Sequence, residues 1–110
     1  MRIERELMRG AGPAAVLRLL EPGERYGYEL VELLEVRSEG VLAMGQSTLY
    51  PLLYNLQAKG LIAARRQVAA SGRVRKYYRL TSKGHRRLAR ERKQWQALSV
   101  AMGKLGLAGN

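Results

Sequence analysis

The 110-residue sequence contains no cysteine and no phenylalanine. Without cysteine the chain can form neither a disulfide nor a thiolate zinc site, and it cannot carry a cysteine nucleophile. Without phenylalanine the interior must be built from leucine, valine, tyrosine, methionine and the single tryptophan. Because the chain is short and 46% hydrophobic, we expect one small domain with a modest core.

Long apolar segments are missing as well. No apolar run approaches the roughly 18 residues that a membrane-spanning helix requires. The first ten residues, MRIERELMRG, lack the apolar centre of a signal peptide. From these two absences we expect a cytoplasmic protein without a membrane partner.

Acidic residues are few compared with basic ones. The chain has 20 Lys and Arg but only 9 Asp and Glu, so its formal net charge is +11, and its pI is near 10.7. Such an excess favours a polyanionic partner, either nucleic acid or an anionic lipid surface. A charge that serves only solubility is the alternative, although a mixed surface of modest net charge would be enough for that.

The residue combinations typical of catalytic sites are also absent. The sequence shows no Ser/His/Asp set, no carboxylate pair in an apolar setting and no phosphate-binding loop. His85 is the only histidine and has no acid at ligand spacing, so we expect no metal site and no cofactor. The sequence therefore predicts a binding protein and not an enzyme.

The first 60 residues show helical patterns. A short helical arm is predicted over residues 1–10, followed by a separate helix whose first turn holds Pro13 and whose end precedes Pro22. A second helix is predicted over residues 26–40 and a third over residues 45–60, both with leucines at helical spacing.

The period of the pattern changes after residue 60. Two runs rich in β-branched, aromatic and basic residues, 61–68 and 73–80, flank a small-residue turn and predict a β-hairpin. Strand alternation gives the second run one strongly basic face, formed by Arg73, Arg75, Tyr77 and Arg79. Thr81 is suited to cap a long final helix. The predicted fold is mostly α with a small β-hairpin, which is the order of a winged helix-turn-helix followed by a long helix.

The third predicted helix has two different faces. Four leucines share one side and predict its core face, namely Leu49, Leu52, Leu53 and Leu56. Small, aromatic or hydroxyl-bearing residues lie opposite, namely Ser47, Pro51, Tyr54 and Ala58. No acid lies between Gln46 and Lys59, so this face can approach phosphates and base edges without repulsion. We expect Ser47 or Thr48 to cap the helix; the alternative role for Tyr50 and Tyr54 is packing beside the hairpin.

Four motifs occur in order along the chain: LMRG at residues 7–10, YGYEL at 26–30, STLYPLLYNLQAKGLI at 47–62 and GRVRKYYRLTSKG at 72–84. Together they resemble the PadR family of bacterial transcriptional regulators. The resemblance implies a homodimeric winged helix protein that binds double-stranded DNA at an inverted-repeat operator, usually as a repressor. Val74 stands where the family's wing commonly has a proline, so this wing lacks that local stiffness.

The resemblance also implies roles for particular residues. Nine residues of the third helix and the wing are predicted to contact DNA: Gln46, Ser47, Thr48, Tyr50, Tyr54, Gly72, Arg73, Arg75 and Lys76. Six residues of the final helix and the N-terminal segment are predicted to form the dimer interface: Leu7, Met8, Leu88, Trp95, Leu98 and Met102. On this basis residues 1–80 are a winged helix DNA-binding domain with an N-terminal arm, and residues 81–110 are a dimerisation helix with a short tail.

Some alternatives remain open at this point. Trp95 either packs in the seam of the final helix or lines a pocket for a small aromatic effector together with Met8 and Met102. The basic run at residues 85–93 is either a solvated helix face or a source of additional DNA attraction. A basic RNA-binding or ribosome-associated protein is the alternative function, in which Tyr77 and Tyr78 would stack on bases. A winged helix that binds only proteins would not need the basic wing.

Overall fold

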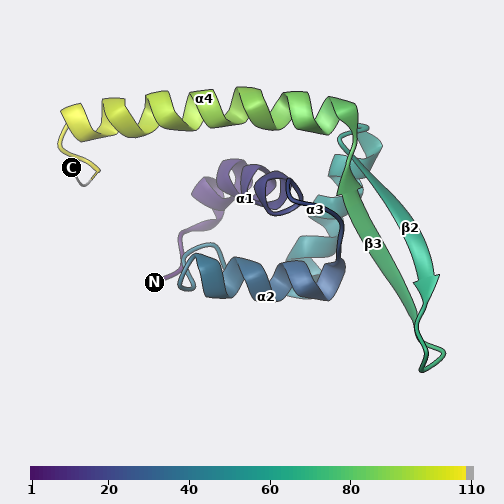
Figure 1. Cartoon of the computed structure of the whole chain (residues 1–110). Helices are drawn as coiled ribbons and strands as arrows, with labels where there is room; N and C mark the ends of the chain where they lie inside the picture. The colour runs from purple at the N-terminus through teal and green to yellow at the C-terminus, as the bar shows by residue number, and fades with distance from the viewer. Residues whose placement is uncertain (109–110) are drawn as a thin grey trace.

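The computed structural model describes residues 1–108. Its elements in chain order are α1 (Arg5–Leu19), β1 (Arg25–Tyr26), α2 (Gly27–Arg37), α3 (Gln46–Ala58), β2 (Ile62–Val68), β3 (Val74–Leu80) and α4 (Ser82–Lys104). The strands form one antiparallel sheet in the order β1-β3-β2. In Figure 1, α4 runs along one side of the molecule with α1 between it and α2, while the β2–β3 hairpin extends away from the helices. The predicted fold class, mostly α with a hairpin and a long last helix, is confirmed.

Helix α1 is longer than the sequence predicted. The arm and the following helix, predicted as separate segments, form one continuous helix with Pro13 in its interior, so that division was wrong. A proline inside a helix removes one backbone hydrogen bond. Packing offsets this loss, because α1 is buried on both sides of the proline, at Met8 and Gly12 before it and at Val16 and Leu17 after it. A β-carbon built on Gly12 would lie 3.3 Å from the side chains of both Leu52 and Met44.

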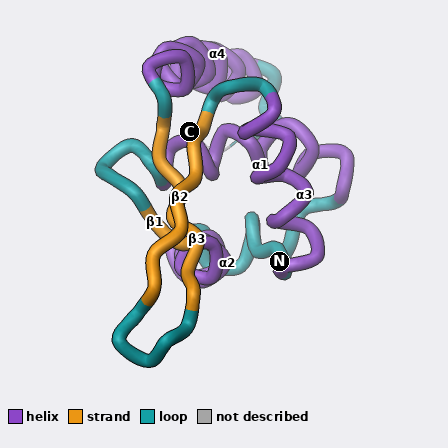
Figure 2. The backbone as a smooth tube through the Cα atoms, turned by 90° about the vertical axis from the view of Figure 1, so that its right-hand side faces the viewer, coloured by secondary structure: helices purple, strands orange, loops and turns teal. Residues whose placement is uncertain are grey.

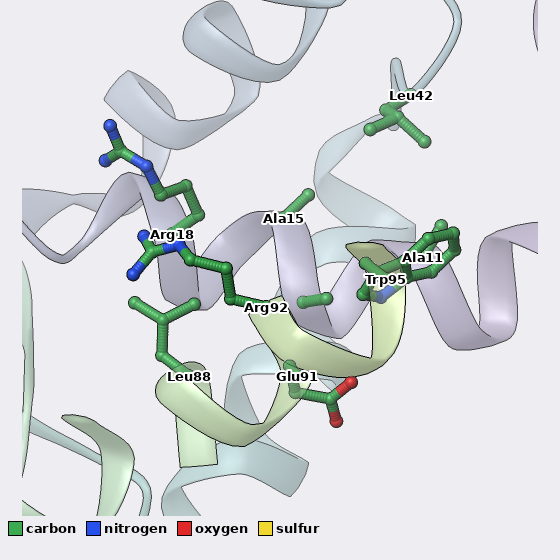
Figure 3. Close-up of a pocket in the computed structure, with 9 residues that line it drawn as sticks. Ala11, Ala15, Arg18, Leu42, Leu88, Glu91, Arg92 and Trp95 are labelled. Atoms are coloured by element: carbon green, nitrogen blue, oxygen red, sulfur yellow. The ribbon is translucent and has the colours of Figure 1, made fainter. Parts of the chain in front are cut away.

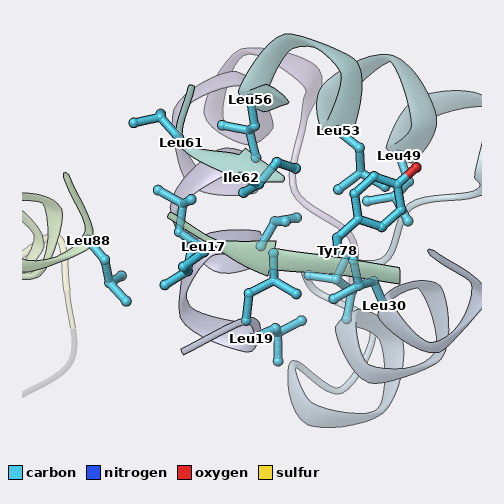
Figure 4. Close-up of a cluster of buried hydrophobic side chains, with 14 of the residues drawn as sticks. Leu17, Leu19, Leu30, Leu49, Leu53, Leu56, Leu61, Ile62, Tyr78 and Leu88 are labelled. Carbon is cyan, nitrogen blue, oxygen red and sulfur yellow. The ribbon is translucent and has the colours of Figure 1, made fainter. Parts of the chain in front are cut away.

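One hydrophobic core joins all four helices to the sheet. The most buried side chains come from α1 and its C-cap, α2, α3 and the chain entering β2, namely Val16, Leu17, Leu20, Leu30, Leu49, Leu53, Leu61 and Ile62. Figure 4 shows the leucines of α3 facing Tyr78 of β3 and the side chains of α1. The predicted core face of α3 is correct, since Leu49, Leu53 and Leu56 are buried and Leu52 is half-buried.

The short strand β1 was not predicted. Arg25 and Tyr26 pair with Tyr78 and Tyr77 of β3, so α2 begins at Gly27. A two-residue strand is too short to show an alternating pattern. Its backbone also fixes the start of α2, because the Tyr26 N–H donates to Glu29 Oε1 at 3.2 Å. Glu29 is half-buried where it makes this contact.

The start of α4 is fastened to the end of α3. Thr81 caps α4 as predicted, with the Gly84 N–H donating to its Oγ1 at 3.0 Å. The same Oγ1 donates to the Gly60 carbonyl at 2.6 Å, and Lys83 Nζ donates to the Lys59 carbonyl at 2.9 Å. A β-carbon on Gly84 would overlap the Leu61 carbonyl, whose carbon would lie only 3.0 Å away. The start of α4 is therefore joined to the backbone carbonyls that follow α3.

Candidate nucleic-acid interface

Helix α3 is capped earlier in the chain than the sequence predicted. Its N-cap is Gly45, whose carbonyl accepts from the Leu49 N–H at 2.9 Å, so the capping role expected for Ser47 or Thr48 was wrong. No side chain caps this end. With Gly45 as the cap, Pro51 lies beyond the first turn and removes one bond from the Ser47 carbonyl. Ser47 is exposed, so water can satisfy that carbonyl.

The surface of α3 that faces away from the core is uncharged. All five residues of α3 predicted to contact DNA are exposed, namely Gln46, Ser47, Thr48, Tyr50 and Tyr54. Tyr54 is 74% exposed and does not pack beside the hairpin. Tyr50 is 41% exposed and rests on α2, since a β-carbon on Gly27 would be 2.6 Å from its hydroxyl. Tyr54 thus has the freer ring of the two.

The β2–β3 hairpin forms the wing. Its turn is closed by the Gly72 N–H donating to the Ala69 carbonyl at 2.9 Å, and Gly72 has a φ of +83°, which favours glycine. Arg73 and Lys76 are exposed, whereas Arg75 is half-buried. Figure 2 shows the tip projecting beyond α2 on the side away from α4.

The distribution of charge along the chain separates this region from the rest. Residues 40–90, which hold α3, the wing and the first turns of α4, contain no acid and eleven basic residues: Lys59, Arg65, Arg66, Arg73, Arg75, Lys76, Arg79, Lys83, Arg86, Arg87 and Arg90. In the described part of the chain only Arg65 among these forms an ion pair. The remaining positive charge is therefore available to an anionic partner.

The ion pairs of the molecule involve its exposed surface. Arg65 bonds to Glu24 and lowers the pKa of that carboxyl. Arg92 bonds to Glu21, with its Nη2 2.8 Å from Glu21 Oε1, and lowers the pKa of the Glu21 carboxyl. The pKa of Tyr78 is raised, mainly by burial and further by the neighbouring Tyr50.

A hollow of about 650 Å³ opens between the wing and the first turns of α2 and α3. It is lined by Tyr26, Gly27, Tyr28, Gln46, Tyr50, Arg73, Val74, Arg75 and Lys76. Five of the nine residues predicted to contact DNA are thus gathered around one concave surface. Thr48 lies on the opposite edge of α3 and lines a different cavity beside α1. Gly72 lies at the wing turn, and Ser47 and Tyr54 lie on the outer side of α3.

Sequence reasoning did not assign Tyr26 and Tyr28 to this surface. Tyr28 is 48% exposed, and both tyrosines line the hollow. The sequence did contain a signal for this assignment. Tyr26 and Tyr28 flank the first residue of a helix whose core face is otherwise made of leucine and valine. Tyr77 and Tyr78, considered for base stacking, are engaged elsewhere: Tyr78 is 3% exposed, and the Tyr77 ring meets Tyr26 edge-on.

The residues of the predicted effector pocket do not line one cavity within a single chain. Trp95 lines an apolar groove of about 280 Å³ between α1 and α4, together with alanines of α1 and Leu88 (Figure 3). Met8 lines a separate cavity of about 750 Å³ between α1, α3 and α4. Met102, near the end of α4, lines neither of them.

The six predicted dimer-interface residues divide into two groups. Met8 and Leu88 are buried within the chain itself, at 8% and 4% exposure. Leu7, Trp95 and Leu98 remain exposed and Met102 is half-buried. Trp95 and Leu98 leave an apolar strip along the second half of α4 without a partner in one chain, while the exposed Leu7 belongs to α1.

Residues 1–108 hold no cluster of His, Asp or Glu suited to a metal ion, and His85 is exposed on α4. No helix in the same range is long and apolar enough to cross a bilayer.

Three helices, a projecting basic hairpin and a long last helix define a winged helix protein whose basic hairpin adjoins an acid-free helix. The family model described as "Transcriptional regulator PadR-like family" matches residues 16–90. The chain belongs to this PadR-like family of transcriptional regulators.

Individual relatives agree with this assignment. The chain is 32% identical over 108 residues to the transcriptional regulator Rv3488 of Mycobacterium tuberculosis, covering 96% of this chain and 97% of that protein. It is 38% identical to a PadR family transcriptional regulator from Eggerthella lenta, with a TM-score of 0.79 over 91% of this chain and 85% of that one. Bacillus subtilis PadR, solved in complex with operator DNA, is 28% identical, with a TM-score of 0.67 over 72% of this chain and 44% of that one.

Proposed function

We propose that the chain is a homodimeric repressor that binds double-stranded DNA at an inverted-repeat operator. The observation that carries the proposal is the acid-free stretch of residues 40–90, which includes both the exposed face of α3 and the wing. A duplex presents a dense line of negative charge, and basic groups that approach it release counterions. The homologue from Bacillus subtilis bound to operator DNA supports this interpretation.

In this proposal α3 enters the major groove. Its exposed hydroxyl and amide groups face the base edges. These groups belong to Gln46, Ser47, Thr48, Tyr50 and Tyr54. The wing contacts the flanking phosphate backbone of the DNA through Gly72, Arg73, Arg75 and Lys76. The different roles of the wing and α3 follow from side-chain chemistry. Guanidinium and ammonium groups pair with phosphates, whereas uncharged polar groups form hydrogen bonds with base edges.

The second copy joins through α4, in particular the exposed strip that holds Trp95 and Leu98. Two-fold symmetry would present two α3 helices to two half-sites, so the operator would be palindromic. Leu7 and Met102 extend the contact, while Met8 and Leu88 support it from inside each chain.

A planar aromatic effector is the regulatory part of the proposal. Trp95 is 40% exposed above the alanine-lined groove between α1 and α4, and a ring could stack on it there. Met8 and Met102 would complete the pocket only if the two copies bring them next to Trp95. Binding at the seam would change the angle between the protomers and lower operator affinity.

Titration of planar aromatic compounds should quench Trp95 fluorescence, and no response across a diverse panel would leave Trp95 as a packing residue.

The proposed function is tested by selecting bound duplexes from a random library. A palindromic consensus is expected, and the same protein should bind structured RNA of equal length less tightly. If RNA is preferred, the alternative function, a basic RNA-binding or ribosome-associated protein, would replace the proposal.

Salt dependence tests the wing separately. Arg73→Ala should weaken binding to all sequences and reduce the slope of log affinity against log salt by about one, because one phosphate contact is lost. Arg37→Ala is the control, since Arg37 ends α2 on the side opposite the hollow and should leave the slope unchanged. Equal slopes for both variants would mean that the Arg73 guanidinium does not reach a phosphate.

A further inference from the structure

The outer face of the sheet carries a continuous stack of aromatic rings and guanidinium groups. The guanidinium carbon of Arg75 lies 4.7 Å from the centre of the Tyr26 ring. The Tyr26 and Tyr77 rings meet edge to face, with centres 5.8 Å apart. At the other end the guanidinium carbon of Arg65 lies 4.9 Å from the centre of the Tyr77 ring. The stack follows the strand register, which pairs Tyr77 with both Tyr26 and Arg65.

The two arginines of the stack differ in their hydrogen bonds. Arg65 donates through Nε to Glu24 Oε2 at 2.9 Å, through Nη2 to the other oxygen of Glu24, and through Nη1 to Gln67 at 2.7 Å. Arg75 has no such partner within residues 1–108. A stacked guanidinium uses only its flat face, and its five N–H donors point outward in the plane. The Arg75 side chain is therefore held in place while its donors stay available.

Arg75 is also held beside the proposed DNA-binding helix. It lines the 650 Å³ hollow together with Gln46 and Tyr50 of α3. The ring that carries it is itself fixed, because the Tyr26 backbone pairs with Tyr77 and donates to Glu29.

We propose that Tyr26 is a positioning residue, which orders the Arg75 guanidinium in the free protein so that its donors face an incoming DNA phosphate. The proposal rests on the proposed function and adds a residue that does not itself touch the bases. Ordering a long side chain costs conformational entropy at the moment of binding. A side chain ordered beforehand avoids that cost, so Tyr26 raises affinity through Arg75 alone.

The first test needs no DNA. Relaxation of the arginine Nε–Hε groups by NMR should show Arg75 more ordered than Arg73, whose exposed side chain serves as the internal reference. Tyr26→Leu should make Arg75 as mobile as Arg73, and Tyr26→Phe should keep it ordered because the ring remains. Equal mobility of the two arginines in the unmodified protein would overturn the proposal, even if Tyr26→Leu does not fold.

The second test is a double-mutant cycle in duplex binding. Tyr26→Leu should lower affinity by between about two- and tenfold, the range expected for losing one ordered side chain. In an Arg75→Ala background the same change should have almost no further effect, whereas in an Arg73→Ala background it should keep its full effect. Additive losses with Arg75→Ala would show that Tyr26 acts only through general stability and would overturn the proposal. If the unmodified protein bound no duplex, the proposed function itself would fail.

Discussion

Gly84 and Gly103 lie in the same helix but have opposite surroundings. A β-carbon at Gly84 would overlap the Leu61 carbonyl, whereas nothing lies within 4 Å of a β-carbon at Gly103. The backbone at Leu61 cannot move easily, because its carbonyl also accepts from the Thr81 N–H at 3.1 Å. Close packing therefore requires glycine at position 84 but not at position 103, although the sequence alone does not distinguish the two.

Gly84→Ala is expected to destabilise the protein by about 3 kcal/mol, as forced overpacking does. Gly103→Ala should stabilise it by up to about 1 kcal/mol, because alanine is the better helix former. Urea denaturation of both variants measures the two free energies of unfolding. A Gly84→Ala variant as stable as the unmodified protein would mean that α4 can move away from Leu61 at little cost.

The two tyrosines of α3 give a prediction about binding without loss of the fold. Replacing Tyr50 and Tyr54 with phenylalanine removes two hydroxyls and leaves both rings, so the free energy of unfolding should change by less than about 1 kcal/mol. Operator affinity should fall, with the larger share from Tyr54 because its ring is more exposed. Binding isotherms of the two single variants measure that division; unchanged affinity in the double variant would exclude hydroxyl contacts.

Helices with a strong leucine pattern were predictable, and their junctions were not. The leucine face of α3 follows from spacing alone, and the cap at Thr81 follows from its hydroxyl before a long polar helix. The continuity of α1 through Pro13 depends on tertiary packing on both sides of the proline, which no local pattern contains. The stack on Tyr26 depends on the register of a two-residue strand, so the sequence showed the tyrosine without its role.

Two loop carboxylates connect elements that are distant in sequence, and their pairing gives a pH dependence. Glu21 bonds to Arg92 of α4 and Glu24 bonds to Arg65 of β2, and in both cases the guanidinium lowers the carboxyl pKa. A carboxyl pKa lowered in the folded state stabilises the protein above its ordinary value of 4.5, and this contribution is lost as the pH falls through the folded-state pKa.

The free energy of unfolding should therefore decrease as the pH is lowered from about 6 to about 3, with carboxyl protonation as the cause. The double variant Glu21→Gln and Glu24→Gln should show a flatter decrease, measured by urea denaturation at each pH. Glu32→Gln, a change at an exposed residue of α2, is the control and should keep the original pH profile. Identical profiles for all three proteins would assign the acid sensitivity to other groups.

At the scale of the whole molecule, charge and apolar surface are separated. The acidic residues lie before residue 40, apart from Glu91, and the exposed acids Glu32 and Glu35 belong to α2, which begins beside the wing and runs away from it (Figure 1). The apolar strip lies along the second half of α4, where Leu98 and Val100 are 43% and 60% exposed. One chain thus has a basic wing and an unpaired apolar strip on α4.

Leu98→Asp is expected to produce a monomer, because a carboxylate in an apolar interface remains unpaired. Sedimentation velocity measures the change in mass, and the far-UV spectrum should remain helical because Leu98 is outside the core of the single chain. Lys93→Asp places the same charge on the exposed side of α4 and should remain dimeric. An unmodified protein that sediments as a monomer would contradict the proposed dimer.

The junction between α3 and α4 allows a tilt of the long last helix to move α3. The 23 residues of α4 span about 35 Å at the helical rise, and no flexible linker separates this helix from β3 or from the end of α3. A tilt of about 5° at its far end would displace α3 by about 3 Å, close to the rise of one base pair. In the proposed dimer, a small molecule that tilted α4 slightly would thus shift α3 out of register with its proposed half-site.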